Sequence, residues 1–441
     1  MIETFLAQSR WFGGKGRAFS VSGVRELGRL GTAPEVVLLL VEVTYDGTRD
    51  RELYQVPLAL YDEPQERLEH ALAARWPLGL ADGAYAYDAV QDRAAMAHFL
   101  RAFGERPGFR TLPGHELDRD AVASPFSGEQ SNSSVFFGED AVLKLFRKVT
   151  PGENPDITTH RVLTEAGSTH VAQLYGWIEA DDLHLGMLQQ FLRTASDGWD
   201  LALASVRDLF AEADLHAEEV GGDFAAEAAR LGTALAEVHA QLAASFPVTE
   251  ASGAALSAAM TDRLAAATDV VPDLTAHAAG ARAVFDAVAG LDAVPVQRIH
   301  GDLHLGQTLR TVLGWKLVDF EGEPAKPLAE RLLPDSPWRD VAGLLRSFDY
   351  APHAVAESIG DDGPDAAHQR AHRADEWARR NRKAFLASYC GDEGLSAEDR
   401  TLLTAYVVDK AVYECVYEAR NRPTWLPIPL AGVARLTASS R

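Results

Sequence analysis

Two segments constrain this chain more than any other part of its sequence: His300-Gly-Asp-Leu-His-Leu-Gly-Gln307 and Leu317-Val-Asp-Phe-Glu-Gly322. Each places an aspartate, Asp302 or Asp319, after a short apolar run that is typical of a β-strand. We therefore expect a pair of carboxylates that project from neighbouring β-segments into one crevice. One such aspartate is usually a turn or capping residue. Two of them, with the amide of Gln307 five residues after the first, are hard to obtain by chance.

These side chains match the parts that kinases use for phosphoryl transfer. One carboxylate, predicted to be Asp302, orients the attacking hydroxyl group and accepts its proton as the catalytic base. The other carboxylate and an amide oxygen, predicted to be Asp319 and Gln307, hold Mg²⁺ against the phosphates of ATP, because Mg²⁺ prefers hard oxygen ligands. The sequence therefore predicts ATP and Mg²⁺ as cofactors.

A kinase of this kind also needs a lysine on a strand to hold the α- and β-phosphates. Lys144 lies in the apolar run of residues 141–146 and is the predicted phosphate ligand, although a strand lysine by itself more often points to solvent. One strand earlier, a polar loop lies where a phosphate-covering loop belongs, and its side chains and backbone N–H groups are the predicted ATP contacts. These residues are Gln130, Ser131, Asn132, Ser133 and Ser134. An ordinary polar hairpin turn is the alternative interpretation.

Other kinds of site fit the sequence less well. The only Gly-Lys dipeptide is followed by Gly16 rather than Ser or Thr, which excludes a Walker-type loop. A zinc site at His300, Asp302 and His304 is disfavoured, because two histidines at this spacing bind zinc from a helix and this segment follows a strand. The ring of His300 is better interpreted as a scaffold that hydrogen-bonds backbone carbonyls. The absence of a Gly-x-Ser-x-Gly segment excludes the serine-hydrolase arrangement.

Charge and composition limit the partners. With 42 Lys and Arg against 64 Asp and Glu, the formal net charge is −22, so most of the surface would repel a nucleic acid. Two cysteines, Cys390 and Cys415, provide no disulfide framework. The longest aliphatic run, residues 36–41, is far shorter than the ~18 residues of a membrane helix. We expect a cytoplasmic protein with no nucleic-acid partner and no membrane partner.

The order of the elements predicts an α+β fold. Apolar runs with turn signals predict strands in the first half of the chain. These lie near 35–45, 53–56, 134–137, 141–146, 173–178 and 183–191. Helical periodicity prevails from about residue 197 onward, with short strand-like runs at 294–299 and 315–320.

The chain resembles the aminoglycoside-phosphotransferase branch of eukaryotic-like kinases and, more narrowly, the bacterial maltokinase family. The similarity extends from the two aspartate segments over nearly the whole chain. Further similar motifs are Arg10-Trp-Phe-Gly-Gly-Lys-Gly16, Pro151-Gly-Glu-Asn-Pro-Asp156, Asp340-Val-Ala-Gly-Leu-Leu-Arg-Ser-Phe-Asp349 and Tyr417-Glu-Ala-Arg-Asn-Arg-Pro-Thr-Trp425. The resemblance implies a bilobal protein-kinase-like fold with a β-rich cap domain at 1–90, a kinase N-lobe with an intermediate subdomain at 91–196, and a helical C-lobe at 197–441.

The resemblance also implies further site residues. Glu321 is implied to assist with the metal or the substrate, and His304 is a candidate for the same roles. In the family, the helix after the Pro-Gly-x-Asn-Pro-Asp motif often carries an acid where this chain has Thr158. The candidate ion-pair partners of Lys144 are therefore Asp156 and Glu165.

Near the C-terminus, acidic and aromatic residues recur at helical spacing. One interpretation is a core stripe flanked by solvated acids. The other is a sugar pocket in which carboxylates bind hydroxyl groups and an aromatic ring covers the pyranose. The candidate substrate residues are Asp409, Tyr413, Glu414, Tyr417, Glu418, Arg420 and Trp425.

We expect an ATP- and Mg²⁺-dependent sugar kinase that converts maltose to maltose 1-phosphate. The alternative acceptor is an amino sugar, glucosamine, converted to glucosamine 6-phosphate, because the acids near 409–418 would suit an ammonium group. A third interpretation is a pseudokinase or binding module, against which the intact candidate site residues argue. The expected partners are a small sugar and an enzyme of the same sugar pathway.

Overall fold

The computed structural model describes residues 2–76, 84–126, 128, 131–212, 216–323, 326–360 and 363–438. The chain forms two compact units. Unit 1 comprises Met1–Thr164 and Ala172–Arg193, and unit 2 comprises Glu165–Val171 and Thr194–Arg441. The predicted division at residues 90 and 196 stays a prediction.

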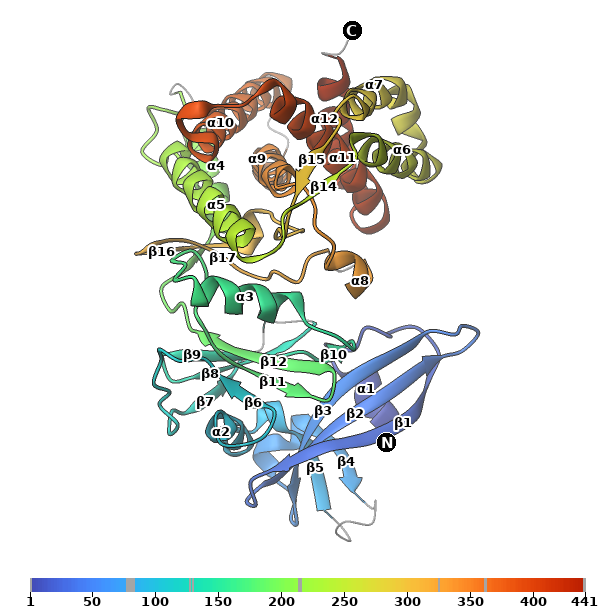
Figure 1. The fold of residues 1–441 in the computed structure, drawn as a ribbon, viewed down its shortest axis with the longest axis vertical. Helices are drawn as coiled ribbons and strands as arrows, with labels where there is room; N and C mark the ends of the chain where they lie inside the picture. The colour runs from blue at the N-terminus through green and yellow to red at the C-terminus, as the bar shows by residue number, and fades with distance from the viewer. Residues whose placement is uncertain are drawn as a thin grey trace. The chain divides into compact units, whose positions relative to one another are not determined.

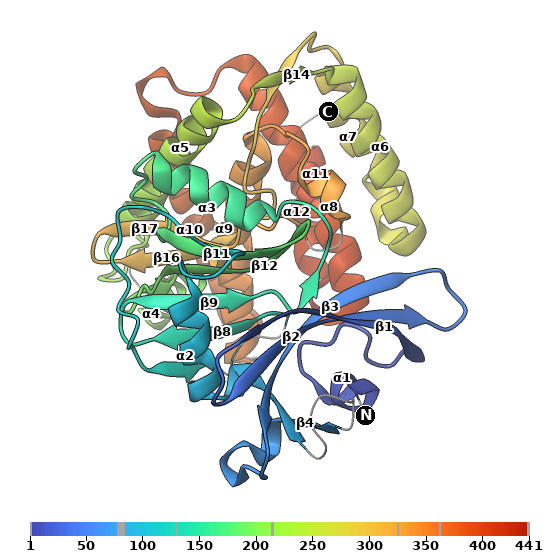
Figure 2. The same cartoon turned by 60° about the horizontal axis from the view of Figure 1, so that its bottom comes forward.

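The first sheet of unit 1 is antiparallel. In the described residues its strands run in the order β1-β2-β3-β5-β4, and β10 pairs with β3 (Figure 1 and Figure 2). The strands are β1 Phe19–Leu30, β2 Glu35–Tyr45, β3 Arg51–Tyr61, β4 Leu72–Trp76, β5 Ala84–Asp88 and β10 Lys148–Val149. The helical elements beside them are α1 Ile2–Gln8, η1 Glu66–Ala71, η2 Ala89–Gln91 and α2 Arg93–Ala102.

Strand β2 is the hydrophobic centre of this sheet because both of its faces are covered. Val37, Leu39 and Val41 belong to a cluster that includes Leu6 of α1. Leu38 and its alternate neighbours instead join the core shared with α2 and the second sheet of unit 1. A strand buried on both faces reads as a continuous apolar run, which is why residues 36–41 lack alternation.

The second sheet of unit 1 carries Lys144 on an interior strand. Its order in the described residues is β6-β11-β12-β9-β8-β7. The strands are β6 Phe109–Thr111, β7 Ala123–Pro125, β8 Ser133–Phe137, β9 Ala141–Leu145, β11 Leu174–Ala180 and β12 Leu183–Gln190. Helix α3, Pro155–Glu165, follows β10 and is the helix expected after the Pro-Gly-x-Asn-Pro-Asp motif.

Unit 2 is mainly helical. Its helices are α4 Gly198–Ala211, α5 Ala225–Ser245, α6 Gly253–Val270, α7 Ala278–Ala289, α8 Leu328–Arg331, α9 Trp338–Ile359, α10 Pro364–Cys390, α11 Ala397–Asn421 and α12 Pro427–Ala438. Its 3-10 turns are η3 Pro272–Ala276, η4 Leu305–Gln307, η5 Gly391–Glu393 and η6 Pro423–Trp425. Helix α9 is buried on nearly all sides from Asp340 to Pro352, and it contacts α4, α10 and α11 (Figure 1).

Two small sheets interrupt the helices of unit 2. One has the order β13-β16-β17, with β13 Ser196–Asp197, β16 Thr308–Thr311 and β17 Gly314–Leu317. The other pairs β14 Thr249–Ala251 with β15 Val294–Val296. The prediction that the two acids follow neighbouring strands is therefore wrong, since β15 and β17 belong to different sheets. The run 294–299 is also a shorter strand than predicted, because Gln297 instead makes an isolated backbone bridge with Asp335.

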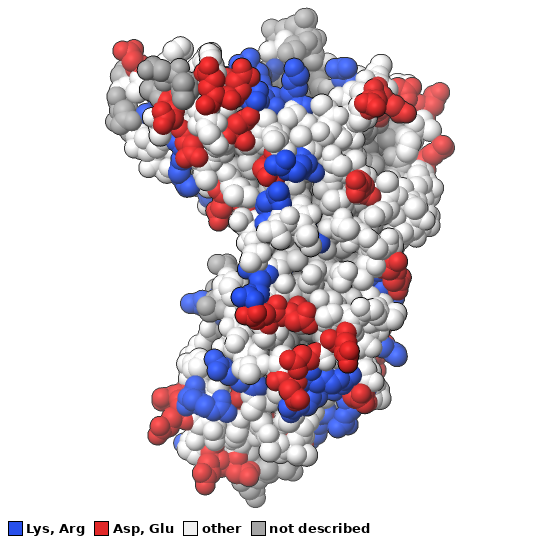
Figure 3. Space-filling model, turned by 90° about the vertical axis from the view of Figure 1, so that its left-hand side faces the viewer, with Lys and Arg blue, Asp and Glu red and all other residues white. Residues whose placement is uncertain are grey.

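On the face drawn in Figure 3, Lys and Arg are interspersed with Asp and Glu on each unit. Across the described ranges, no helix is both long enough and apolar enough to traverse a bilayer.

Candidate active site

Lys144 points to a buried carboxylate in unit 1. Its Nζ lies 3.1 Å from Oδ2 of Asp156, and the two side chains are 13% and 2% exposed. Asp156 lies in the first turn of α3, where Oδ1 of Asn154 accepts its backbone N–H at 2.8 Å. Burial opposes ionisation of Asp156, but the charges of Lys144 and His160 hold the pKa of its carboxyl well below the ordinary value. The lysine is thus held in place on its strand.

The two candidate partners of Lys144 differ in position. Asp156 contacts the lysine, whereas Glu165 is exposed at the last residue of α3. The hydroxyl of Thr158, where the family often has an acid, donates to the carbonyl oxygen of Asn154 at 3.1 Å. The acid that this chain lacks at 158 is therefore replaced by one that stands two residues earlier.

The predicted phosphate loop leads into β8. Gln130 lies outside the described residues, Ser131 is exposed and Asn132 is half-buried. Ser134 pairs with Lys144 in the register of β8 and β9, and directly opposed residues share a face of the sheet. Ser133 pairs with Leu145 instead, and its hydroxyl accepts a hydrogen bond from Nε of Arg147 at 2.7 Å. The Ser133 side chain therefore lies on the face opposite Lys144, which argues against its predicted contact with ATP.

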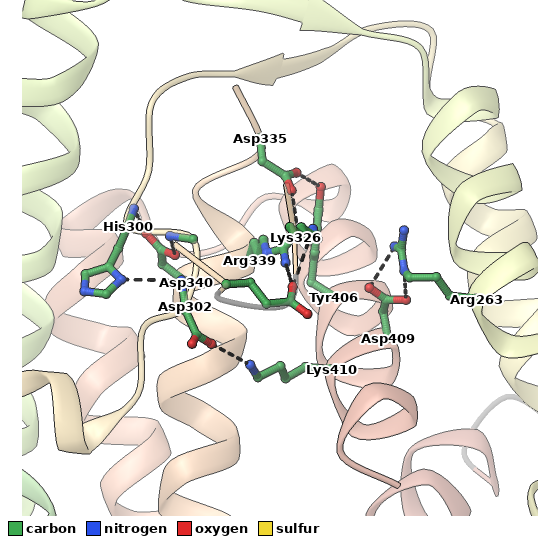
Figure 4. Close-up of polar contacts among 12 residues, drawn as sticks. Arg263, His300, Asp302, Lys326, Asp335, Arg339, Asp340, Tyr406, Asp409 and Lys410 are labelled. Atoms are coloured by element: carbon green, nitrogen blue, oxygen red, sulfur yellow. Dashed lines mark hydrogen bonds and ion pairs between the residues drawn. The ribbon is translucent and has the colours of Figure 1, made fainter. Parts of the chain in front are cut away.

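Asp302 of unit 2 lies in a loop whose backbone is held by Asp340, in the first turn of α9. The two carboxylate oxygens of Asp340 accept the N–H groups of His300 at 2.7 Å and Gly301 at 2.9 Å (Figure 4). Nε2 of His239 lies 3.0 Å from the same carboxylate. Burial opposes ionisation of Asp340, yet His239 and these N–H groups keep the pKa of its carboxyl below the ordinary value. A buried carboxylate thus supports the loop immediately before Asp302.

Helix α9 also approaches the loop after Asp302. A Cβ on Gly343 would lie 2.1 Å from the carbonyl oxygen of Leu303, so a glycine is required at this contact. Four residues further along α9, Oγ of Ser347 accepts the N–H of Leu305 at 3.2 Å. The backbone on both sides of Asp302 is therefore fixed by one buried helix.

The carboxylate of Asp302 is paired with a cation. Its Oδ1 lies 3.3 Å from Nζ of Lys410 on α11 (Figure 4). Burial opposes ionisation, but Lys410 and the two nearby histidines lower the pKa of the Asp302 carboxyl. Burial lowers the pKa of His304, whose Nδ1 accepts the N–H of Gly306 at 3.1 Å. At neutral pH the arrangement offers an ionised carboxylate, which is the form that accepts a proton from a hydroxyl group.

Asp319 and Gln307 lie side by side in unit 2. Nε2 of Gln307 donates to Oδ2 of Asp319 at 3.0 Å. Asp319 has a φ of 68°, in the left-handed region, a conformation that costs roughly 1–3 kcal/mol and is concentrated at functional sites. The ring Nε2 of His300 contacts the carbonyl oxygen of Val318 at 2.9 Å, which confirms the predicted scaffold role of this histidine. Carboxylate and amide oxygens so placed are suitable ligands for Mg²⁺.

The loop after Asp319 is tied to a network of ion pairs in unit 2. Glu321 is half-buried, and its carbonyl oxygen accepts a hydrogen bond from Nη1 of Arg331 at 2.9 Å. The guanidinium nitrogens of Arg339 form ion pairs with Oε2 of Glu323 and Oδ2 of Asp335, each at an N–O distance of 2.9 Å (Figure 4). These contacts connect the loop to the start of α9.

A cavity of about 910 Å³ opens beside Asp302 in unit 2. Small-molecule sites usually measure ~300–1,000 Å³. Its walls include Trp199 of α4, Asp302, His304 and Lys410. Of the predicted substrate residues, those in the wall are Tyr413, Glu414, Tyr417, Glu418, Arg420 and Trp425. Asp409 is not one of the described lining residues, and its two oxygens instead accept hydrogen bonds from Arg263 of α6 at 2.9 and 2.8 Å (Figure 4).

The two glutamates of the cavity wall are each held by an arginine. Glu414 contacts the fully buried Arg346 at 2.8 Å, and Glu418 accepts two hydrogen bonds from Arg422 at 2.9 and 2.7 Å. Burial raises the pKa of Glu414 despite the charge of Arg346. The ring of Trp425 stacks on that of Tyr350, with 6.3 Å between the ring centres. Carboxylates, cations and aromatic rings in one cavity suit a polyhydroxylated ligand.

Lys410 and Asp340 were not predicted as site residues. Asp340 lies in a motif that carried the resemblance, but an acid in the first turn of a helix has the ordinary role of balancing the helix dipole. Helical spacing could have predicted Lys410 as a site residue, because Tyr413, Glu414 and Tyr417 lie three, four and seven residues after it on the same helix face. The predicted set of substrate residues began at Asp409, whereas the helix face in the cavity wall begins one residue later, at Lys410.

Comparisons with known proteins show the family of this chain. Residues 5–92 match the maltokinase N-terminal cap domain, and residues 122–381 match the phosphotransferase enzyme family. A glucosamine kinase of Streptacidiphilus jiangxiensis is 32% identical over 382 residues, which cover 81% of this chain and 84% of the relative. A glucosamine kinase of Mycolicibacterium smegmatis is 29% identical, with 81% and 91% covered.

Solved structures show the same fold. Glucosamine kinase in complex with glucosamine, ADP and inorganic phosphate aligns with a TM-score of 0.72 at 23% identity, covering 98% of both chains. A second crystal form of glucosamine kinase aligns with a TM-score of 0.71, also at 23% identity, covering 99% of both chains. The predicted α+β kinase-like fold, with a β-rich N-terminal cap and a helical C-terminal region, is confirmed.

Proposed function

The chain belongs to the phosphotransferase enzyme family, and on that premise we propose that it phosphorylates glucosamine to glucosamine 6-phosphate. It is an ATP-dependent carbohydrate kinase. The proposal concerns which sugar is the acceptor and which of its hydroxyl groups is phosphorylated. The observation that carries the proposal is the position of Asp302, an ionised carboxylate in the wall of a sugar-sized cavity. The two relatives named glucosamine kinase favour an amino sugar over the maltose expected from the sequence.

Asp302 is proposed to orient the acceptor hydroxyl and to take its proton as the γ-phosphate of ATP is transferred. Lys410 supports this role because its charge keeps the carboxyl ionised. Asp340 and Gly343 support it by fixing the backbone on either side of the base. A base held in one place contributes through proximity and proton transfer, with no need for reorganisation during the reaction.

Lys144 is proposed to hold the phosphates of ATP, with Ser134 on the same face of the sheet. The buried Asp156 supports this role by fixing the ammonium group. Asp319 and Gln307 are the residues that would hold Mg²⁺, with Glu321 as a further candidate. A bound Mg²⁺ supplies neutralisation of the phosphate charge that develops in the reaction.

Maltose remains a second candidate because of one observation. Lys410 places a cation beside the proposed base, and arginines hold both glutamates of the cavity wall, Glu414 and Glu418. An ammonium group close to Lys410 would be repelled, whereas a neutral disaccharide would not. A cavity of about 910 Å³ is also large enough for two sugar rings.

A sugar panel with phosphorus NMR of the product tests the proposal. ADP release with ATP and Mg²⁺ is measured with glucosamine, maltose and no sugar, and the NMR spectrum identifies the phosphorylated hydroxyl. We expect glucosamine 6-phosphate. Faster release with maltose, giving a 1-phosphate, would replace the acceptor. If neither sugar increases ADP release while ATP still binds, the acceptor is a different molecule and the proposal is wrong.

A further inference from the structure

A buried arginine joins the two sheets of unit 1. Arg147 is 1% exposed, and its Nη2 donates to both oxygens of Asp88, at the end of β5, at 2.9 and 2.7 Å. Its Nε donates to Oγ of Ser133, at the start of β8. Its guanidinium carbon lies 4.6 Å from the ring centre of Trp11. One side chain therefore links the N-terminal sheet to the end of the predicted phosphate loop.

The same N-terminal sheet also holds the chain that follows Lys144. The side chain of Gln55, in β3, is fully buried and donates to the carbonyl oxygens of Phe146 at 3.1 Å and Leu185 at 2.7 Å. The backbone N–H of Gln55 donates to the carbonyl oxygen of Arg147 at 2.7 Å. The next residues form β10, which is itself a strand of that sheet.

Both contacts act on the strands that carry the proposed nucleotide ligands. Arg147 fixes Ser133, the residue before Ser134, and Gln55 fixes the segment two residues after Lys144. Since Ser133 lies on the face opposite Lys144, these contacts do not occupy the proposed phosphate face. A buried ion pair contributes little net stability compared with apolar packing, so the main effect of Asp88 and Arg147 is on geometry.

We infer that the N-terminal cap is a positioning device for the triphosphate of the nucleotide, with Asp88, Arg147 and Ser133 as its link to the phosphate loop. In this view Arg147 is a positioning residue that touches no reacting atom. The inference rests on the proposed function, because it requires that Lys144 and the loop ending at Ser134 bind the phosphates.

The double variant Asp88→Asn/Arg147→Gln tests the inference without leaving an unpaired buried charge. We expect the KM for ATP to rise about fivefold, the effect of losing one or two hydrogen bonds. The kcat and the KM for the sugar should stay close to the wild-type values. A contribution to stability alone would lower the melting temperature but would not change the KM for ATP, and that outcome would overturn the inference.

A second variant, Ser133→Ala, removes the acceptor while keeping the ion pair. It should raise the KM for ATP as the double variant does, and the triple variant should add nothing further, because the residues act as one unit. Fully additive effects would contradict the link. As a matched control, Asp50→Asn breaks an exposed ion pair with Arg17 beside the same sheet and should leave the KM unchanged.

The variant Lys144→Ala distinguishes a failure of this inference from a failure of the proposed function. If ADP binding, measured by calorimetry, weakens in Lys144→Ala but not in the Asp88, Arg147 and Ser133 variants, the proposed function holds and the inference is wrong. If Lys144→Ala binds ADP as tightly as the wild type, the proposed function of this strand is itself wrong.

Discussion

Nζ of Lys410 lies 3.3 Å from Oδ1 of Asp302, so a cation from α11 accompanies the proposed base on the wall of the sugar-sized cavity (Figure 4). This pair combines two effects. It keeps the carboxyl ionised, as a base requires, and it places a positive charge where an amino-sugar acceptor would have to avoid it. The pair therefore bears on both the reaction and the choice of acceptor.

Replacing the proposed base should nearly abolish turnover. We expect Asp302→Asn to lower kcat by about 10²–10⁴-fold, the usual contribution of a general base. The melting temperature should change little, because the backbone of the loop is held by Asp340 rather than by the Asp302 side chain. Asp269→Asn, at an exposed acid on α6, is the control. Substantial residual turnover in Asp302→Asn would refute the assigned role.

The Lys410 charge should be visible in the pH dependence of kcat/KM. The lowered pKa of Asp302 means that the base stays ionised, and activity is retained, until the pH falls below the ordinary value of about 3.9. Lys410→Met removes the cation, so the pKa of Asp302 rises and the acidic limb of the profile moves to higher pH. An unchanged limb, measured where both proteins remain folded by circular dichroism, would show that Lys410 does not control the base.

The contact between α9 and the loop after Asp302 should not tolerate a methyl group. A Cβ at position 343 would meet the carbonyl oxygen of Leu303 at 2.1 Å, so Gly343→Ala must displace the loop that carries Asp302. We expect about a 10²-fold loss of kcat, since a displacement of ~1 Å can cost that much. Gly290→Ala, whose Cβ would have an ordinary contact at 3.5 Å, should retain full activity. Equal activities of the two variants would contradict the argument.

The proposed metal ligands should couple nucleotide binding to Mg²⁺. We expect calorimetry of the wild-type protein to show tighter ATP binding with Mg²⁺ than without it. In Asp319→Ala this difference should disappear, because one hard oxygen ligand is lost. Affinity in the absence of metal should stay the same, which also serves as the control for folding. A persistent Mg²⁺ effect in the variant would place the ion elsewhere.

Much of the fold was predictable because the signals are local. Apolar runs with turn signals predicted strands where the structure has β2 and β3, and the helix expected after the Pro-Gly-x-Asn-Pro-Asp motif is α3. Strand partners were not predictable in the same way. The apolar runs before Asp302 and Asp319 were predicted to form neighbouring strands. In the structure β15 pairs with β14, and β17 pairs with β16. Such pairing depends on segments distant in the chain, which local patterns do not encode.

The candidate site also has a part that local sequence signals predict and a part that depends on tertiary packing. The sequence by itself selected Asp302, Asp319, Gln307 and Lys144 as candidates, because the chemistry of phosphoryl transfer restricts which side chains can serve and at what spacing. Only the tertiary structure decided which face of α11 borders the cavity, where Lys410 rather than Asp409 is in the wall. Helical periodicity states which residues share a face. Which neighbour that face meets depends on how distant helices pack against it.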